Sequence, residues 1–168
     1  MAILIVWERP DGGISTRYPA YHSQGRPPGD SDSAFRSRCI ARDAIYLTEK
    51  YGVCVPHECD DSKLPPDDYL FPAWRWGGRS VLVDMARARV IHMNRIRVVR
   101  DRELERESGS KYRQPPELES LFSSARLARL QELRDIPQDF DLMVYDSPAA
   151  LRAAWPATLP AERNSGAL

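Results

Sequence analysis

The pattern of apolar residues changes at Asp84, and this change restricts the chain to two regions of different construction. Before it, short apolar or alternating runs are separated by turn-forming residues, as in a small sheet with one helix. After it, one helical pattern extends to about Glu107, with apolar residues three to five positions apart. These residues are Met85, Ala88, Ile91, Ile96 and Val99. The sequence therefore predicts an α+β fold, with a small domain at 1–83 and helices after it.

The first region is predicted to begin with a β-hairpin over residues 2–20. Residues 2–7 are apolar and rich in β-branched side chains, turn-forming residues follow at 10–13, and residues 14–18 alternate. A helix capped by Ser31, Asp32 or Ser33 should end near Lys50, before Gly52. Its predicted core face is Phe35, Cys39, Ala41/Arg42 and Ile45/Tyr46. A short edge strand at 53–57 and a glycine turn at 77–78 into a strand at 79–83 complete the domain.

The second region is predicted to be a helical hairpin at 84–137, followed by a mostly irregular tail at 138–168. The prolines at 115–116 are expected to open the second helix, which spans about 117–135 and stops at Ile136-Pro137. Its packing residues would be Leu118, Leu121, Phe122, Leu127, Leu130 and Leu133. In the tail, Ser147 and Pro148 suit the cap and first position of a short helix to Ala154, and disorder is expected beyond residue 160.

Charge and composition argue against a membrane and against long-range attraction to nucleic acid. The 168 residues include 24 basic and 24 acidic side chains, so the chain has no strong overall field. Its longest apolar run, residues 1–7, is far shorter than the roughly 20 residues of a membrane span. We find no basic and apolar leader with a small-residue cleavage site. A cytoplasmic protein is therefore expected.

The three cysteines, Cys39, Cys54 and Cys59, fit a reducing compartment better than a disulfide framework, because their number is odd. Cys54, His57 and Cys59 also invite a zinc interpretation, since thiolate and imidazole are zinc ligands. The sequence offers no nearby fourth ligand except His22 or Cys39. A half-buried strand with small apolar cysteines accounts for the same run, so neither a metal nor another cofactor is predicted.

No catalytic constellation is predicted, and the chain is expected not to be an enzyme. His22, His57 and His92 lie outside any nucleophile motif. Asp67-Asp68 could serve as paired carboxylates, but behind two prolines they more readily cap a turn. The glycine pairs at 12–13 and 77–78 are isolated, unlike a loop that binds phosphate.

The segment 86–100 contains five arginines and no acidic residue, which gives a basic helix that could follow phosphates. The arginines are Arg87, Arg89, Arg95, Arg97 and Arg100. Acidic residues at 101–107 follow within helical reach, and no aromatic residue is interleaved on which bases could stack. A solvated helix flank is therefore the preferred interpretation, and nucleic-acid binding is the less favoured one.

An aromatic segment at 69–76 contains two of the four tryptophans, Trp74 and Trp76. Such a segment can be a lid that closes the core of the first domain. If exposed, Phe71, Trp74 and Trp76 would instead form a second protein interface, since tryptophan is common at binding hot spots. Both interpretations stay open at this point, and the lid is preferred.

Two C-terminal segments give the strongest functional signal. They are the end of a helix, Leu130-Gln131-Glu132-Leu133-Arg134-Asp135-Ile136-Pro137, and the later pair Trp155-Pro156. This arrangement resembles phage tail assembly chaperones, which typically end in a helix, an Arg-Asp-hydrophobic-Pro stop and a Trp-Pro tail. The link over 138–154 departs from the more direct run to Trp-Pro often found in that family. Upstream, Leu64-Pro65, Asp68, Phe71, Ala73-Trp74 and Ala88-Arg89-Val90-Ile91-His92 resemble prophage proteins from tail regions.

The resemblance implies a phage or prophage tail, or tail-fibre, assembly chaperone that transiently masks a tail protein in the host cytoplasm. Its partner-binding residues would be Leu133, Arg134, Asp135, Ile136, Pro137, Trp155 and Pro156. The alternative is a structural virion component, such as a small fibre-associated or baseplate protein, with the same surface. Trp155 could instead only pack onto the two helices. A role for Trp155 in the interface is the preferred interpretation.

Overall fold

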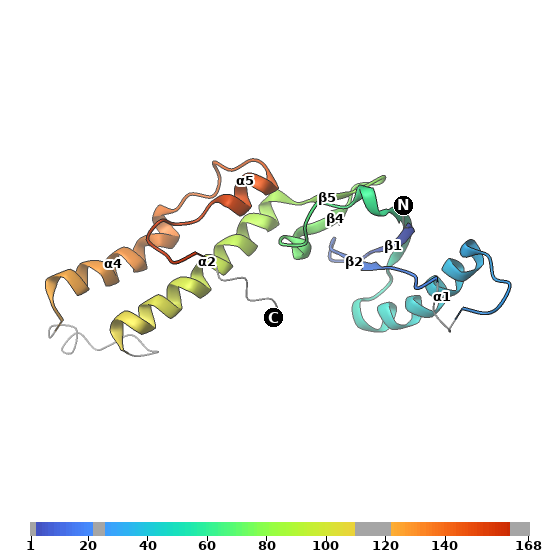
Figure 1. Cartoon of the computed structure of the whole chain (residues 1–168), viewed down its shortest axis with the longest axis horizontal. Helices are drawn as coiled ribbons and strands as arrows, with labels where there is room; N and C mark the ends of the chain where they lie inside the picture. The colour runs from blue at the N-terminus through green and yellow to red at the C-terminus, as the bar shows by residue number, and fades with distance from the viewer. Residues whose placement is uncertain (1–2, 22–25, 110–121, 162–168) are drawn as a thin grey trace. The chain divides into compact units, whose positions relative to one another are not determined.

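The computed structural model describes residues 3–21, 26–109 and 122–161 (Figure 1). The α+β class is confirmed. The chain divides into two compact units, Met1–Asp84 and Met85–Leu168. The strands are β1 (Ile3–Glu8), β2 (Ile14–Arg17), β3 (Val55–Asp60), β4 (Trp74–Trp76) and β5 (Val81–Val83). The helices are α1 (Asp32–Tyr51), η1 (Asp61–Lys63), η2 (Phe71–Ala73), α2 (Met85–Ser108), α4 (Ser124–Asp139) and α5 (Pro148–Ala153).

Strand β1 is the centre of the first unit. It pairs antiparallel with β2 on one side and with β3 on the other, so the sheet order is β2-β1-β3. Successive side chains of a strand point to opposite faces. Leu4 and Val6 therefore pack with Trp74 of the β4–β5 hairpin, whereas Ile5 and Trp7 pack with α1. Because both of its faces are covered, β1 is a continuous apolar run rather than an alternating one.

The β1–β2 turn and both ends of α1 form as predicted. In the turn, the N–H of Gly12 donates to the carbonyl of Arg9 at 2.9 Å, and Gly12 has a φ of 75°, which glycine adopts without strain. Ser31 caps α1, because its side chain accepts a hydrogen bond from the N–H of Ala34. Gly52 ends the helix at a φ of 85°.

The core face of α1 differs from the prediction. The buried residues follow a spacing of four and are Phe35, Cys39, Asp43 and Leu47. The other predicted positions, Ala41, Arg42, Ile45 and Tyr46, are exposed. Arg17 Nε on β2 lies 2.9 Å from Asp43 Oδ2, and this ion pair allows a carboxylate to face the sheet. An apolar pattern within one helix cannot reveal a partner on a distant strand.

Strand β3 begins two residues later than predicted and is longer, but its edge position is as expected. Pro56 lies inside it, opposite Trp7 of β1. An edge strand tolerates a proline where the missing N–H would have faced solvent. The glycine turn at 77–78 also forms, with the N–H of Gly77 donating to the carbonyl of Ser80 at 2.9 Å.

The second unit is built on two antiparallel helices, α2 and α4, which lie side by side, with α5 packed on α2 (Figure 1). The buried residues are Ala88, His92 and Ile96 of α2, Leu130, Leu133 and Ile136 of α4, and Leu151 of α5. The helical hairpin is thus present, and the short helix forms with Ser147 as its cap and Pro148 at its start.

The start of α4 differs from the prediction. Ser123 is the N-cap, because its side chain accepts a hydrogen bond from the N–H of Arg126, and Phe122 therefore precedes the helix. The predicted opening at 115–116 and the packing residues Leu118 and Leu121 lie outside the described residues.

The end of α4 was also predicted wrongly, because Pro137 does not stop it. The helix continues to Asp139, and the N–H of Phe140 still donates to the carbonyl of Ile136 at 2.9 Å. A proline in a helix removes its own N–H donor, here the one that would reach the carbonyl of Leu133. Because this position lies in the last turn, the later N–H groups still bond normally.

The tail expected at 138–168 is packed against the helices as far as it is described. Leu142, Leu151, Ala154 and Leu159 are all buried. These side chains fix residues 142–159 to the second unit, although only α5 within them is regular. The disorder expected beyond residue 160 concerns residues 162–168, which lie outside the described part of the chain.

The substitution Pro137→Ala tests the role of this proline. It should raise the free energy of unfolding by about 1 kcal/mol, because the new N–H can bond to the carbonyl of Leu133. Urea denaturation and melting temperature would measure the change. The matched control is Pro148→Ala at the first turn of α5, where no N–H is needed and no gain is expected. Equal gains in both variants would contradict the explanation.

Candidate functional site

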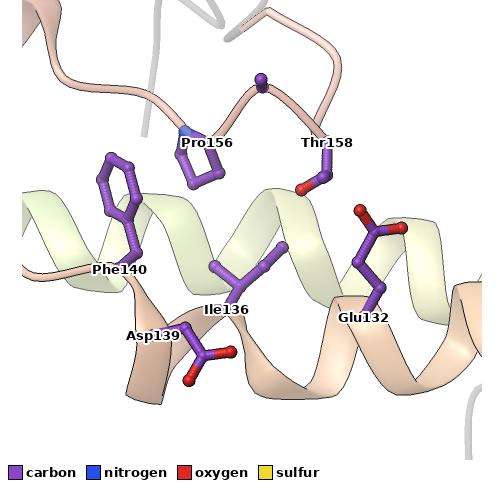
Figure 2. A pocket seen from close by; sticks show the side chains of 7 residues that line it. Glu132, Ile136, Asp139, Phe140, Pro156 and Thr158 are labelled. Carbon is purple, nitrogen blue, oxygen red and sulfur yellow. The ribbon is translucent and has the colours of Figure 1, made fainter.

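A groove on the second unit brings together residues from two segments that are far apart in the sequence (Figure 2). Its volume is about 270 Å³. The end of α4 supplies Glu132, Ile136, Asp139 and Phe140, and the segment after α5 supplies Pro156, Ala157 and Thr158. Figure 2 shows Ile136 between the two carboxylates along the helix, with Pro156 and Thr158 facing it from the other segment.

Helical spacing explains why α4 presents these residues together. Glu132, Asp139 and Phe140 lie four before, three after and four after Ile136, and residues at these spacings share one helix face. Ile136 is almost completely buried and Phe140 is half-buried, whereas the two carboxylates are exposed. The groove therefore has an apolar floor and an acidic rim.

The second wall of the groove is held by hydrogen bonds to the helices. His92 Nε2 on α2 lies 2.6 Å from the carbonyl oxygen of Ala154. Because a carbonyl only accepts, Nε2 of this fully buried imidazole must hold the proton. The guanidinium of Arg129 on α4 donates to the carbonyl of Thr158. The wall is thus attached to both helices, on either side of Pro156.

Trp155 is not among the residues that line the groove. Its indole N–H donates to the carbonyl of Pro160 at 3.0 Å. Its ring contacts the ring of His92 edge-on, with centroids 6.0 Å apart and planes at 72°. Trp155 therefore fixes the course of the chain on both sides of the wall residues.

The predicted partner-binding residues do not all form one surface. Ile136 and Pro156 line the groove. Leu133 is fully buried between the helices, so it cannot contact a partner directly. Arg134, Asp135 and Pro137 are half-buried, and Asp135 Oδ1 accepts a hydrogen bond from Gln131 Nε2 at 2.7 Å.

The groove is also lined by five residues that were not predicted as site residues from the sequence: Glu132, Asp139, Phe140, Ala157 and Thr158. Their helical spacing from Ile136 was a signal for the first three. For Asp139 and Phe140 this signal required the helix to continue, whereas it was expected to stop at Pro137.

The rim of the groove has a net negative character. Glu132 Oε2 lies 2.7 Å from Arg129 Nη1, but exposed ion pairs of this kind contribute only about 0–1 kcal/mol and leave the carboxylate accessible. Asp139 is exposed at the other end of the apolar floor. The groove thus suits an apolar side chain with a positively charged neighbour.

The residues of the zinc interpretation are held apart by the sheet. Cys54 packs in the core on the α1 side, and Cys59 in the core on the side of the β4–β5 hairpin. His57 lies 3.1 Å from Glu8 Oε2 and stacks on Trp76 at 4.5 Å between ring centroids. Within the described residues, no group of three or more His, Cys, Asp and Glu side chains converges on a metal position.

Of the three histidines, the structure describes His57 and His92. His22 lies outside the described residues. His57 is engaged with Glu8 and Trp76, and His92 anchors Ala154, and neither lines the groove.

The aromatic segment forms part of the first core, as the lid interpretation requires. Trp74 is buried and contacts Phe71, with ring centroids 5.0 Å apart. Phe71 and Trp76 are half-buried against the same cluster. A second interface that includes Trp74 is therefore not present on the surface.

The basic helix uses some of its arginines within the second unit. Arg89 Nε donates to the carbonyl of Leu142 at 3.1 Å, and Nη2 donates to the carbonyl of Tyr145 at 2.8 Å. Arg100 bonds to Asp101 through both Nε and Nη2. These arginines fix the fold or neutralise neighbouring acids, which weakens the nucleic-acid alternative.

The metal prediction can be tested directly. Burial raises the pKa of the Cys54 and Cys59 thiols, so both stay protonated at neutral pH, whereas zinc binds the thiolate. Protein purified without chelator should therefore contain no stoichiometric zinc, as measured by elemental analysis. EDTA should leave the melting temperature unchanged. Equimolar zinc, or a clear loss of melting temperature with EDTA, would overturn this.

Comparison of the chain with protein-family models, with curated proteins and with solved structures finds no match. Among the helices that the structure describes, none is sufficiently long and apolar to cross a membrane. These comparisons therefore assign no activity and no ligand to this chain.

Proposed function

We propose that the chain is a non-enzymatic phage tail, or tail-fibre, assembly chaperone that holds a segment of its client in the groove of the second unit. The observation that supports this is the position of Ile136 and Pro156. They belong to the two separate segments that resemble tail assembly chaperones, and both line the same groove. When a motif is divided between two segments, the two segments are expected to lie together at the surface that binds the partner.

The groove is suited to reversible binding. Burying one large apolar side chain contributes about 1.5–3 kcal/mol, and ordering the bound segment offsets part of this. A contact of this size needs support from neighbouring surfaces and is released easily. Assembly requires such release, since the masked surface of a tail protein must later contact its final neighbours.

The acidic rim defines the client segment further. A lysine or arginine beside the apolar anchor would lie near Glu132 or Asp139. Such complementarity increases the rate of association and discriminates against acidic segments more than it adds affinity. The client segment therefore carries an apolar side chain that enters the groove and basic residues on either side of it.

A permanent virion component could use the same groove, and particle composition separates the two roles. A chaperone should be absent from purified particles, whereas a fibre-associated or baseplate protein should be present at fixed stoichiometry. Quantitative mass spectrometry of the particles makes this distinction.

Charge reversal at the rim tests the groove. The variant Glu132→Lys/Asp139→Lys should lower the affinity for the co-expressed tail protein at least about tenfold, roughly 1.4 kcal/mol. Its melting temperature should stay near that of the parent, because both side chains are exposed. The matched control is Glu105→Lys/Asp146→Lys, which makes the same charge change at exposed positions outside the groove. An equal loss in both variants would indicate general charge attraction and contradict a specific groove.

Substitution of Trp155 tests the wall. Trp155→Ala should weaken capture of the tail protein by about 2 kcal/mol or more, the scale of an interface hot spot, because Pro156 loses its support. It should also lower the melting temperature, while the first unit stays folded, since its cores use other residues. Trp155→Phe, which keeps an aromatic ring near His92, should lose less capture. Reduced stability with normal capture at low temperature would exclude this wall from the interface.

A further inference from the structure

A second pocket lies in the first unit, at the open end between β2 and α1, and no part of the proposed function uses it. Its volume is about 380 Å³. Eight residues line it: Trp7, Ser15, Thr16, Arg17, Arg42, Asp43, Tyr46 and Leu47. We refer to it as the sheet–helix pocket. It combines an apolar base with charged and hydroxyl side chains, which is the usual composition of a small-molecule site.

The charged side chains of this pocket form one network around Asp43. Arg17 Nε from β2 lies 2.9 Å from Asp43 Oδ2, as an ion pair without hydrogen-bond geometry. Arg42 Nε from α1 donates to Asp43 Oδ1 at 3.1 Å. Two guanidinium groups thus surround one carboxylate, which leaves one net positive charge at the pocket.

The arginines keep donors for a ligand. A guanidinium has five N–H donors, and its contact with Asp43 involves only the one on Nε. The carboxylate of Asp43 is largely buried and lies within 3.1 Å of both guanidinium groups. Two guanidinium groups held in this way are suited to a planar carboxylate, which can accept paired hydrogen bonds.

Trp7 is the most buried residue of the pocket lining. Trp7 is 1% exposed, and its indole N–H has no hydrogen-bond partner within the described protein. The same side chain contributes its apolar ring to the pocket, next to Leu47.

From these observations we propose that the sheet–helix pocket binds a small organic anion with a flat apolar body. Its carboxylate lies against Arg17 and Arg42, and its apolar part points toward the buried base of the pocket at Trp7 and Leu47. The volume fits a ligand with one aromatic ring rather than a polymer. Such a ligand would bridge β2 and α1 and stabilise the first unit, since a ligand that binds only the folded state raises its stability.

Benzoate and benzamidinium are suitable probes, because they share a ring and carry opposite charges. The full chain has four tryptophans and therefore four indole N–H signals in a ¹H–¹⁵N spectrum. Trp7→Phe identifies the signal of Trp7 by its absence. At constant ionic strength, benzoate up to about 10 mM should shift the Trp7 signal saturably, and benzamidinium should not. Equal shifts with both probes, or no saturable shift with benzoate, would overturn the proposal.

Two arginines of α1 provide the matched variants. Arg42→Gln should raise the dissociation constant for benzoate at least about tenfold, since a charged hydrogen-bond donor is removed. Its side chain is 63% exposed, so the variant should remain folded. Arg38→Gln removes the same charge one turn earlier, at a residue that pairs with Asp30 outside the pocket, and should leave benzoate binding unchanged. Unchanged binding in Arg42→Gln, or equal losses in both variants, would contradict the proposed site.

Discussion

The groove depends on the hydrogen bond between the buried imidazole of His92 and the carbonyl of Ala154. A polar ring inside an apolar helix interface is unfavourable unless it has a partner, and the carbonyl supplies one at 2.6 Å. This bond fixes the end of α5 against α2. The following residues are then held beside α4, where the Arg129 bond to Thr158 fixes them a second time. Without the first bond, the start of the wall that contains Pro156 would lose its hydrogen bond to α2.

The two buried polar side chains of the described core, Asp43 and His92, both lie next to a concave surface. Asp43 lines the sheet–helix pocket, and His92 supports the wall of the groove. Each connects segments that are far apart in the sequence: β2 with α1 in one case, and α2 with the chain after α5 in the other. A polar group in an apolar interface fixes the relative position of two elements more precisely than apolar packing does, because hydrogen bonds and ion pairs depend strongly on geometry.

Most of the local structure could be predicted from the sequence, because its determinants are neighbours in the chain. Ser31 and Gly52 define the ends of α1, and Ser147 and Pro148 define the start of α5. In α2, Ala88 and Ile96 are buried as predicted, but the third buried residue is His92. The error in the core face of α1 occurred where a distant partner decides the outcome. Asp43 is buried because of Arg17, and Ile45 is exposed as a result. The end of α4 is a different case, because the deciding bond is local: the N–H of Phe140 still donates to the carbonyl of Ile136, so the helix passes Pro137.

The candidate site was only partly accessible to sequence reasoning for the same reason. Ile136 and Pro156 were identified, yet their meeting depends on the return of the chain over α4. That return is set by Leu151, Ala154 and Leu159, whose burial only the folded structure reveals. The buried position of Leu133 follows equally from the packing of α4 on α2.

The burial of β1 on both faces limits which sequence changes this strand can accept during evolution. Odd and even residues of the strand belong to different cores, with Leu4 and Val6 on one side and Ile5 and Trp7 on the other. Exchange of one apolar side chain for another alters a single core. Insertion or deletion of one residue would transfer every side chain beyond that point to the opposite core, where the space has another shape. The strand is therefore tolerant of substitution but not of any change in length.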